Sequence, residues 1–515
     1  MISLKLYISP KGDSMKKFTV IMILAVMIFA CLVSCAENPP ANVPKDTKAA
    51  TETATVEQAT VAITEEEEDT GDYEADLPEE KFTGDFNILC EGNFWATDSN
   101  LYKEEASDDP VDNGVWMRVD KIREQFEADI IVTPSANTAG DLKVSINSGD
   151  RAFNAVCQRM PLMASSASNN ELMNLYDVDG IDLSKAYWDQ SANKQLSIGG
   201  KLYYTVGDII TNDDACTWVM MFNKKLAEIY DFPNLYEIVE QGKWTFDYFY
   251  QLLKTDDLSH SDDATWDYED RYAFSTHRDM AYGFFYGADL SFVGKDERDI
   301  PYIIDDAQSA EKTQKVLEFA LKVMRQDNLT LDAHKWTHVN PWATILTQDA
   351  FEQDRALYYA EVLSTIINLR SMDTDFGLLP MPKYDEAQQN YVTFVNPAAS
   401  LVGVPIYQKN NSNARRSGVI LEAMAYYGHE YIVPAFIEKA IKGKSTRDVE
   451  SIDMLEILFQ NRMYDLGLIN DWSGYASGYS DLVFNNKTDF SNLYKKVSKS
   501  LGKKINKFLE KITKV

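Results

Sequence analysis

The alternation of apolar and polar positions predicts a strand–helix–strand–helix–strand order at the start of the folded body. The run 86–92 is a short apolar stretch typical of a buried strand. Apolar side chains at Val115, Val119, Ile122 and Phe126 follow the spacing of one helix face. A second strand, a short helix that Gly149 stops, and a third strand are predicted next, over residues 129–134, 141–150 and 153–160. This order predicts a right-handed parallel sheet with helices on its faces.

Further along the chain the pattern continues to mix strands with helices and shows no internal repeat. Thr245 is expected to cap a helix that has Asp247 in its first turn. The other expected elements are a hairpin at 198–209 around Gly199 and Gly200, a strand leading into a helix at 216–230, a long helix at 309–325, a strand–loop region at 376–396 and a helical block at 413–466. The body is therefore expected to be α/β throughout.

Before this body lies an apolar leader followed by a polar stretch. Lys16 and Lys17 precede an apolar run at 18–33, which is shorter than a stable transmembrane helix and is typical of a signal peptide. Residues 1–14 are then upstream of the true start. The run ends in Leu-Val-Ser and Cys35, which resembles a bacterial lipobox, so Cys35 is expected to be lipidated and to anchor the protein. An ordinary secretory signal or an uncleaved N-terminal anchor are the alternatives, and each places the body outside the cytoplasmic membrane.

Residues 36–82 are rich in proline, threonine and acidic residues, and we expect them to form a disordered linker. The remaining body is too long for one hydrophobic core, so two or more lobes are predicted. A net charge of −30 excludes nucleic acid as a partner, because such a surface repels phosphates. The five cysteines show no metal-binding spacing; Cys90 and Cys157 are expected to be buried free thiols, and no metal is expected.

Polar residues follow two of the predicted strands directly. Ligands of open α/β sheets bind at the carboxyl ends of the strands, where the strand order reverses. That rule indicates Glu91, Asn93 and Trp95 after the first strand, and Gln158 and Arg159 after the third.

Five segments, in this order, carry a resemblance to a known family. They are residues 197–208, 220–254, 351–362, 376–391 and 445–467. Together they resemble family 1 extracellular solute-binding proteins, the substrate-binding lipoproteins of ATP-driven importers, over about residues 86–466. One segment departs from the family pattern, because Gln353 and Asp354 stand where a glycine is usual.

The resemblance implies a type II periplasmic-binding-protein-like fold: two lobes, each a mostly parallel sheet flanked by helices, with the solute held in the cleft between them. The lobes would comprise residues 84–205 plus 360–392, and 215–350 plus 400–515. The crossings between them would lie near 207–217, 349–361 and 392–401. It also implies a mono- or oligosaccharide as the solute, an ABC permease as the partner, and a place on the outer face of the cytoplasmic membrane.

A saccharide site needs aromatic platforms for the C–H faces of the sugar and polar groups for its hydroxyls. Beside Glu91, Asn93, Trp95 and Arg159, candidates at the implied crossings or in predicted loops are Asp208, Trp218, Trp342, Glu361, Asn396, Trp472 and Tyr475. The other tryptophans singled out, Trp116, Trp188 and Trp244, are expected in the core. The tail from residue 491 is a basic amphipathic helix, which is expected to pack against the second lobe or to touch anionic lipid or the importer.

These expectations describe a monomeric receptor with no catalytic residues and no cofactor. Two alternatives stay open at this point. A glycan-active enzyme would need two carboxylates facing each other across a cleft, and the many acidic residues of the chain do not exclude one. A surface glycan-binding or signalling lipoprotein would use the same fold without a permease.

Overall fold

The computed structural model describes residues 72–92, 100–263, 265–369, 372–409, 412–441 and 449–512. The predicted signal peptide, Cys35 and most of the predicted linker lie outside the described residues, and so do Asn93 and Trp95. Residues Gly71–Val515 form one compact unit, and the whole described hydrophobic core lies within it.

The first sheet has four strands in the order β12-β3-β1-β2. Their bounds are Ser400–Gly403 for β12, Ala155–Arg159 for β3, Gly84–Glu91 for β1 and Ala128–Ser135 for β2. Strand β1 pairs in parallel with both β2 and β3, and β12 runs antiparallel to β3. The predicted parallel β-α-β-α-β unit is therefore confirmed, with Cys90 and Cys157 as buried partners on neighbouring strands.

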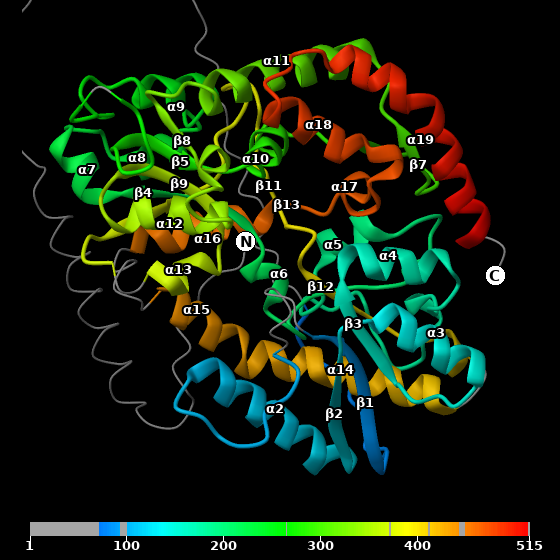
Figure 1. Cartoon of the computed structure of the whole chain (residues 1–515). Coiled ribbons are helices and arrows are strands. Elements are labelled where there is room, and N and C mark those ends of the chain that lie inside the picture. The colour runs from blue at the N-terminus through cyan, green and yellow to red at the C-terminus, as the bar shows by residue number, and fades with distance from the viewer. Residues whose placement is uncertain are drawn as a thin grey trace, which may run out of the picture. The chain divides into compact units, whose positions relative to one another are not determined.

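Two helices connect these strands as their sequence patterns predict. Helix α2 (Pro110–Phe126) buries Val115, Val119, Ile122 and Phe126 on one face, and Asp109 caps its start. Helix α3 (Thr138–Ser148) ends at Gly149, whose φ of 70° closes the helix in the left-handed conformation that glycine adopts at little cost. Figure 1 shows α2 alongside the much later helix α14 (Ser412–Tyr431), with which it makes extensive contacts.

The second sheet has five strands in the order β10-β4-β9-β5-β8. Their bounds are Phe376–Leu379, Trp218–Asn223, Ala356–Val362, Tyr272–Thr276 and Thr330–Asp332 in that order. Strand β5 runs parallel to β8 and β9, whereas β4 runs antiparallel to β9 and β10. Helix α9 (Phe246–Leu253) begins at the predicted cap, since the Thr245 side chain accepts a hydrogen bond from the backbone N–H of Tyr248.

Short helices and two small strand pairs complete the fold. Besides α9, the described helices between β3 and β12 are α4 (Met160–Ser168), η1 (Leu175–Asp177), α5 (Gln190–Leu196), α6 (Asn212–Ala215), α7 (Lys224–Ile229), α8 (Leu235–Glu240), α10 (Met280–Gly287), α11 (Ala307–Met324), η2 (Ala333–Trp336), α12 (Ala343–Glu352) and α13 (Thr365–Asn368). Those after β12, besides α14, are η4 (Ile406–Gln408), α15 (Val433–Ile441), α16 (Val449–Gln460), α17 (Leu466–Asn470), η5 (Trp472–Gly474), α18 (Tyr475–Phe484) and α19 (Phe490–Ile512). Strands β6 (Val293–Lys295) and β7 (Pro301–Ile303) pair, as do β11 (Thr393–Phe394) and β13 (Arg462–Met463).

The strand pairings differ from the division of the chain that the sequence predicted. Residues 360–392 were expected with the first sheet, yet β9 lies in the middle of the second sheet and β10 at its edge. Residues 400–515 were expected with the second, yet β12 pairs with β3 and α14 packs on α2. Likewise, residues 349–361 were expected to cross between the lobes, yet they belong to the end of α12 and to β9. Strand β9 lies within the second sheet and α12 packs against that sheet. A short apolar run indicates a strand, but only tertiary contacts decide which sheet edge accepts it.

The C-terminal helix α19 buries the predicted apolar stripe of Val497, Leu501, Ile505, Phe508 and Ile512. It contacts α11, α18, η5 and β7, and also α4, which follows the first sheet directly. Figure 1 shows it as the red helix that leads to the C-terminus, with β7 beside it. Within the described part of the chain, no helix is both long and apolar enough to cross a membrane.

Candidate functional site

The carboxyl end of the first sheet brings together Glu91 and Arg159, as the strand-end rule predicts, and Gln158 precedes Arg159 in β3. Glu91 ends β1 and Arg159 ends β3. The backbone N–H of Arg159 donates to Glu91 Oε2 at 3.2 Å, and its guanidinium Nε lies 3.2 Å from Glu91 Oε1. The carboxylate is buried whereas 36% of the arginine side chain is exposed. The ion pair therefore holds a partly exposed guanidinium at this edge of the sheet.

Gln158 adds an unusual feature to this edge. Its side chain is completely buried, and neither Nε2 nor Oε1 has a hydrogen-bond partner among the described residues. A buried amide without partners costs about 1–3 kcal/mol, and an ordered water or a polar ligand group would remove that cost. A hydroxyl group, which both donates and accepts, matches the two ends of the amide.

The corresponding edge of the second sheet carries a buried ion pair between Glu361, near the end of β9, and His277, which follows β5. His277 Nε2 lies 2.7 Å from Glu361 Oε2, and both side chains are less than one tenth exposed. Burial disfavours the charged imidazole, but the charge of Glu361 and its hydrogen bond outweigh burial and raise the pKa of His277 to about 9.

This raised pKa predicts a pH-dependent stability. A histidine whose pKa rises on folding from about 6.5 to about 9 stabilises the fold fully below pH 6.5 and loses that contribution as the pH rises through 9. We expect His277 to contribute about 2–3 kcal/mol to the fall in the free energy of unfolding between these pH values. Urea unfolding of His277→Gln at several pH values should show that this slope is lost.

His260 offers the matched control for that series. It also lies beside carboxylates, Asp257 and Asp262, but about half of its side chain is exposed. The variant His260→Gln should therefore keep the pH slope of the unchanged protein. An unchanged slope in His277→Gln would show that the buried pair does not titrate in this range.

Trp218, a predicted platform for the ligand, lies in the core instead. It begins β4 with no exposed surface. Its ring stacks on Phe394 with 5.3 Å between ring centroids and makes an edge-type contact with His277 at 5.6 Å. Its indole N–H has no hydrogen-bond partner among the residues that the structure describes. Its burial gives the ring a packing role, since a tryptophan is also well suited to fill the space where strands end; contact with a ligand stays a prediction.

Two further predicted aromatics pack inside the fold as well. The predicted loop that holds Trp472 and Tyr475 consists of η5 and α18, which lie against α19. Trp472 meets the ring of Phe508 at 5.4 Å, Tyr475 meets Phe292 at 5.2 Å, and each is 7% exposed. Glycine and serine in this stretch indicated an exposed loop, whereas its apolar residues are covered by the following helix. Trp342, by contrast, is 69% exposed and immediately precedes α12.

The chain between the two sheet edges contains the remaining predicted residues. Asn396 donates its backbone N–H to the carbonyl of Cys216 at 2.9 Å, and its Oδ1 accepts the N–H of Ala398 at 3.0 Å. Four residues later Ser400 pairs with Arg159. Asn396 is thus half-buried in the segment that joins the two edges.

Asp208 lies on the first predicted crossing. Its Oδ2 is 2.6 Å from Nδ1 of His429 on α14, and the His429 ring stacks on Tyr73 at 4.2 Å. Burial raises the pKa of Asp208, and the hydrogen bond to His429 opposes that rise. These contacts hold the crossing against α14, so the structure assigns Asp208 a positional role there.

A buried ionic cluster beside the crossings was not found from the sequence. Arg462 on β13 lies 2.6 Å from Asp189, 3.1 Å from Asp213 and 2.5 Å from Asp214, and the Tyr464 hydroxyl donates to Asp189 at 2.8 Å. Asp189 caps α5, whereas Asp213 and Asp214 lie on α6 within the first crossing. The cluster therefore ties three segments together that are far apart in sequence.

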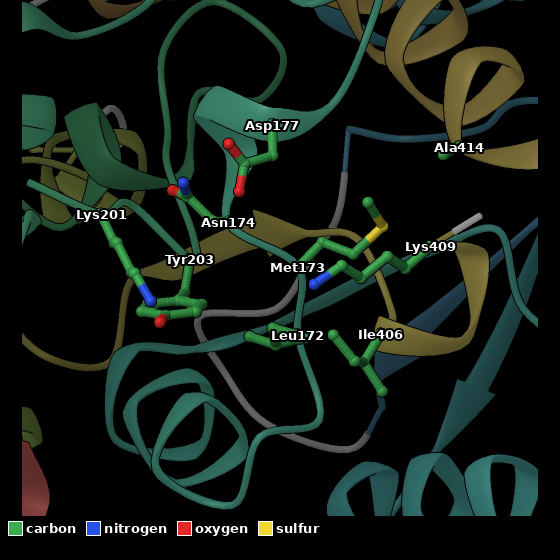
Figure 2. A pocket seen from close by; sticks show the side chains of 9 residues that line it. All are labelled: Leu172, Met173, Asn174, Asp177, Lys201, Tyr203, Ile406, Lys409 and Ala414. Carbon is green, nitrogen blue, oxygen red and sulfur yellow. The ribbon is translucent and has the colours of Figure 1, made fainter. Parts of the chain in front are cut away.

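A cavity of about 250 Å³ lies away from these sheet edges. It opens between residues 172–177, the hairpin residues Lys201 and Tyr203, and the residues Ile406, Lys409 and Ala414 (Figure 2). Its walls are Leu172, Met173, Asn174, Asp177, Lys201, Tyr203, Ile406, Lys409 and Ala414. With one aromatic ring and none of the predicted site residues, it is a poor match to the predicted saccharide site. In the described ranges no group of three or more His, Cys, Asp or Glu side chains is arranged so that it could hold a metal ion.

Known proteins match this chain through its fold. No protein-family model and no curated protein matches the sequence. Among solved structures, the ABC substrate-binding protein Lmo0181 from Listeria monocytogenes, in complex with cycloalternan, matches with a TM-score of 0.51 at 13% identity, covering 83% of this chain and 100% of that one. A cyclo/maltodextrin-binding protein complexed with maltotetraose gives 0.51 at 13% identity over 84% and 99%. M. tuberculosis UspC gives 0.51 at 11% identity over 81% and 99%.

These similarities confirm the predicted fold: the chain is a mixed α/β protein of the periplasmic-binding-protein type. The strand-end rule also locates His277, the partner of Glu361 that was missed at the second sheet. His277 follows an apolar strand as directly as Glu91 does, so the same rule would have indicated it. Arg462 and its aspartates carry no such signal, since their partners lie up to 273 residues away in sequence.

Proposed function

We propose that this chain is an exported, lipid-anchored member of the family 1 extracellular solute-binding proteins, which captures a mono- or oligosaccharide and delivers it to an ABC import permease. The observation that carries the proposal is the set of polar groups at the carboxyl edges of the two sheets. Glu91, Gln158 and Arg159 at one edge and His277 with Glu361 at the other offer donors and acceptors where ligands bind in α/β folds.

Each part of the site has a role that follows from sugar chemistry. Arg159 donates to hydroxyl oxygens, the Gln158 amide both donates and accepts, and Asn396 lies between the two edges. Asn93 and Trp95 follow β1 directly in the sequence, and we propose that Trp95 supplies the ring on which a sugar face stacks. Trp342, as an exposed ring before α12, is proposed as a second contact for longer saccharides.

Binding would use the crossings as hinges and would form no covalent bond. The solved structures with this fold include complexes with cycloalternan and with maltotetraose, which supports an oligosaccharide as the ligand class. The predicted leader and Cys35 support anchoring at the outer face of the cytoplasmic membrane, where a permease would receive the solute.

Isothermal titration calorimetry with maltose, maltotetraose, cycloalternan and a wider panel of saccharides tests the proposal. At least one saccharide should bind. The variant Arg159→Ala should lower its affinity at least tenfold, because the ion pair with the buried carboxylate of Glu91 orients this donor. Arg123→Ala is the control, since Arg123 forms an exposed ion pair with Asp129 on another part of the first sheet.

Two outcomes would contradict the proposal in different ways. Absence of binding across the whole panel would exclude a saccharide receptor. Release of shorter glycans during incubation would instead show a glycan-active enzyme, in which Glu91 and Glu361 would be the first carboxylates to replace.

A further inference from the structure

The solvent-facing side of helix α19 is a lysine face on an otherwise acidic protein. We define the lysine face by seven side chains that are all exposed: Lys495, Lys496, Lys499, Lys503, Lys504, Lys507 and Lys511. One acidic residue, Glu510, lies in the same helix, whereas the whole chain has a net charge of −30. The structure describes no ion pair for any of the seven.

The packing of α19 explains why this face remains in solvent. The buried stripe of Val497, Leu501, Ile505, Phe508 and Ile512 satisfies the apolar side of the helix against the rest of the protein. The charge is therefore not needed to hold the helix in place. The lysines from 495 to 511 extend over roughly 24 Å along one helix, at a rise of 1.5 Å per residue.

We propose that the lysine face binds anionic phospholipid headgroups and turns this side of the protein towards the membrane. The composition of the face favours lipid over a protein partner. Protein interfaces rely on Tyr, Trp and Arg anchors and are depleted of lysine. This face has neither arginine nor an exposed aromatic ring. Lysine rows without a specific partner are typical of diffuse attraction to an anionic bilayer.

The anchoring in the proposed function places such a surface within reach, and the inference rests on that part of it. Only 36 residues lie between Cys35 and Asp72, the first described residue. At physiological salt, electrostatic interactions are screened beyond about 8 Å. The acidic residues elsewhere on the protein therefore do not cancel the attraction between the lysine face and a membrane that it touches. Because an anionic membrane repels the acidic parts of the protein, the lysine face is the side that can approach the membrane.

Sedimentation with lipid vesicles tests the inference without involving a saccharide. The protein used is residues 36–515, which lacks the apolar leader and Cys35 but keeps the compact unit Gly71–Val515 with its whole described core. It should bind vesicles of equal parts phosphatidylglycerol and phosphatidylcholine, should not bind pure phosphatidylcholine, and should dissociate as salt is raised from 50 to 300 mM.

The decisive variant combines Lys499→Gln, Lys503→Gln and Lys507→Gln. Each lysine near an anionic surface is worth about a fivefold change in affinity, so the triple variant should bind at least tenfold more weakly. The control combines Lys143→Gln, Lys243→Gln and Lys254→Gln, three exposed lysines on other segments, and should bind as the unchanged protein does. All three proteins should melt at the same temperature, because only exposed side chains are replaced.

Equal binding by the two triple variants, or no binding to phosphatidylglycerol at 50 mM salt, would overturn the inference. Binding to soluble polyphosphate without binding to vesicles would also overturn it, since the partner would then be a polyanion in solution. Saccharide titrations of the same variants should be unchanged, so failure here and failure of the proposed function are separate results.

Discussion

Replacing Arg462 with methionine is expected to lower the free energy of unfolding by about 3–5 kcal/mol. The arginine is 10% exposed and lies within 3.1 Å of three carboxylates, those of Asp189, Asp213 and Asp214. Methionine keeps much of the volume but removes the charge, which leaves three carboxylates in a buried site without their positive partner. Urea unfolding monitored by circular dichroism measures the difference.

The loss should depend on pH in a way that identifies its cause. Burial raises the pKa of Asp214 to about 6, although Arg462 opposes this rise. Without the arginine the pKa values of Asp213 and Asp214 should rise further, so the folded variant keeps its protons to higher pH. The variant is then least impaired at low pH and loses stability as the pH rises through the raised pKa values. The difference from the unchanged protein should be larger at pH 8 than at pH 5.

Arg415 provides the control for this experiment. It also pairs with two carboxylates, Glu80 and Asp179, each at 2.8 Å, but all three side chains are exposed. Exposed pairs contribute about 0–1 kcal/mol, so Arg415→Met should change stability little. Equal losses in the two variants would mean that burial of the Arg462 cluster does not determine its energy.

The expected effect also bears on how the two sheets are joined. The cluster links β13 to the cap of α5 and to α6, and β13 pairs with β11 on the segment that leads to Asn396. Buried ion pairs therefore connect β13 to α5 and α6, which are far from it in sequence.

The sequence predicts those parts of the fold whose signals are local. The first β-α-β-α-β unit has apolar runs, a helical face ending at Phe126 and a terminating Gly149, all next to one another in the chain. Glu91 and Arg159 could be predicted for the same reason, since each needs only the end of one strand. Their contact then follows from parallel pairing of β1 and β3.

Local sequence signals could not predict which distant segments pack together. Nothing within residues 356–362 distinguishes a central strand of the second sheet from a strand of the first, and β12 joins β3 from about 240 residues away. Tryptophan shows the same limit, because its ring suits both a core and a sugar platform. Trp472 could not be placed without knowing that α19 folds back over it.

Trp218→Ala is expected to cost about 3–5 kcal/mol of stability, which separates a core tryptophan from a ligand platform. The ring has no exposed surface and contacts Phe394 and His277, so alanine would leave a large cavity at the edge of the second sheet. Trp342→Ala is the matched change at an exposed position and should alter stability by no more than about 0.5 kcal/mol. Thermal and urea unfolding of both variants measure the contrast.

A third variant, Trp218→Phe, isolates the indole N–H. It preserves most of the packing and removes a buried donor that has no partner among the described residues, so the two effects oppose each other and the cost should stay below about 2 kcal/mol. If the ring serves packing alone, saccharide affinity in this variant should equal that of the unchanged protein. A tenfold loss of affinity with stability maintained would instead mean that the indole N–H donates to the ligand. Trp218 would then be a ligand-binding residue, as the sequence predicted.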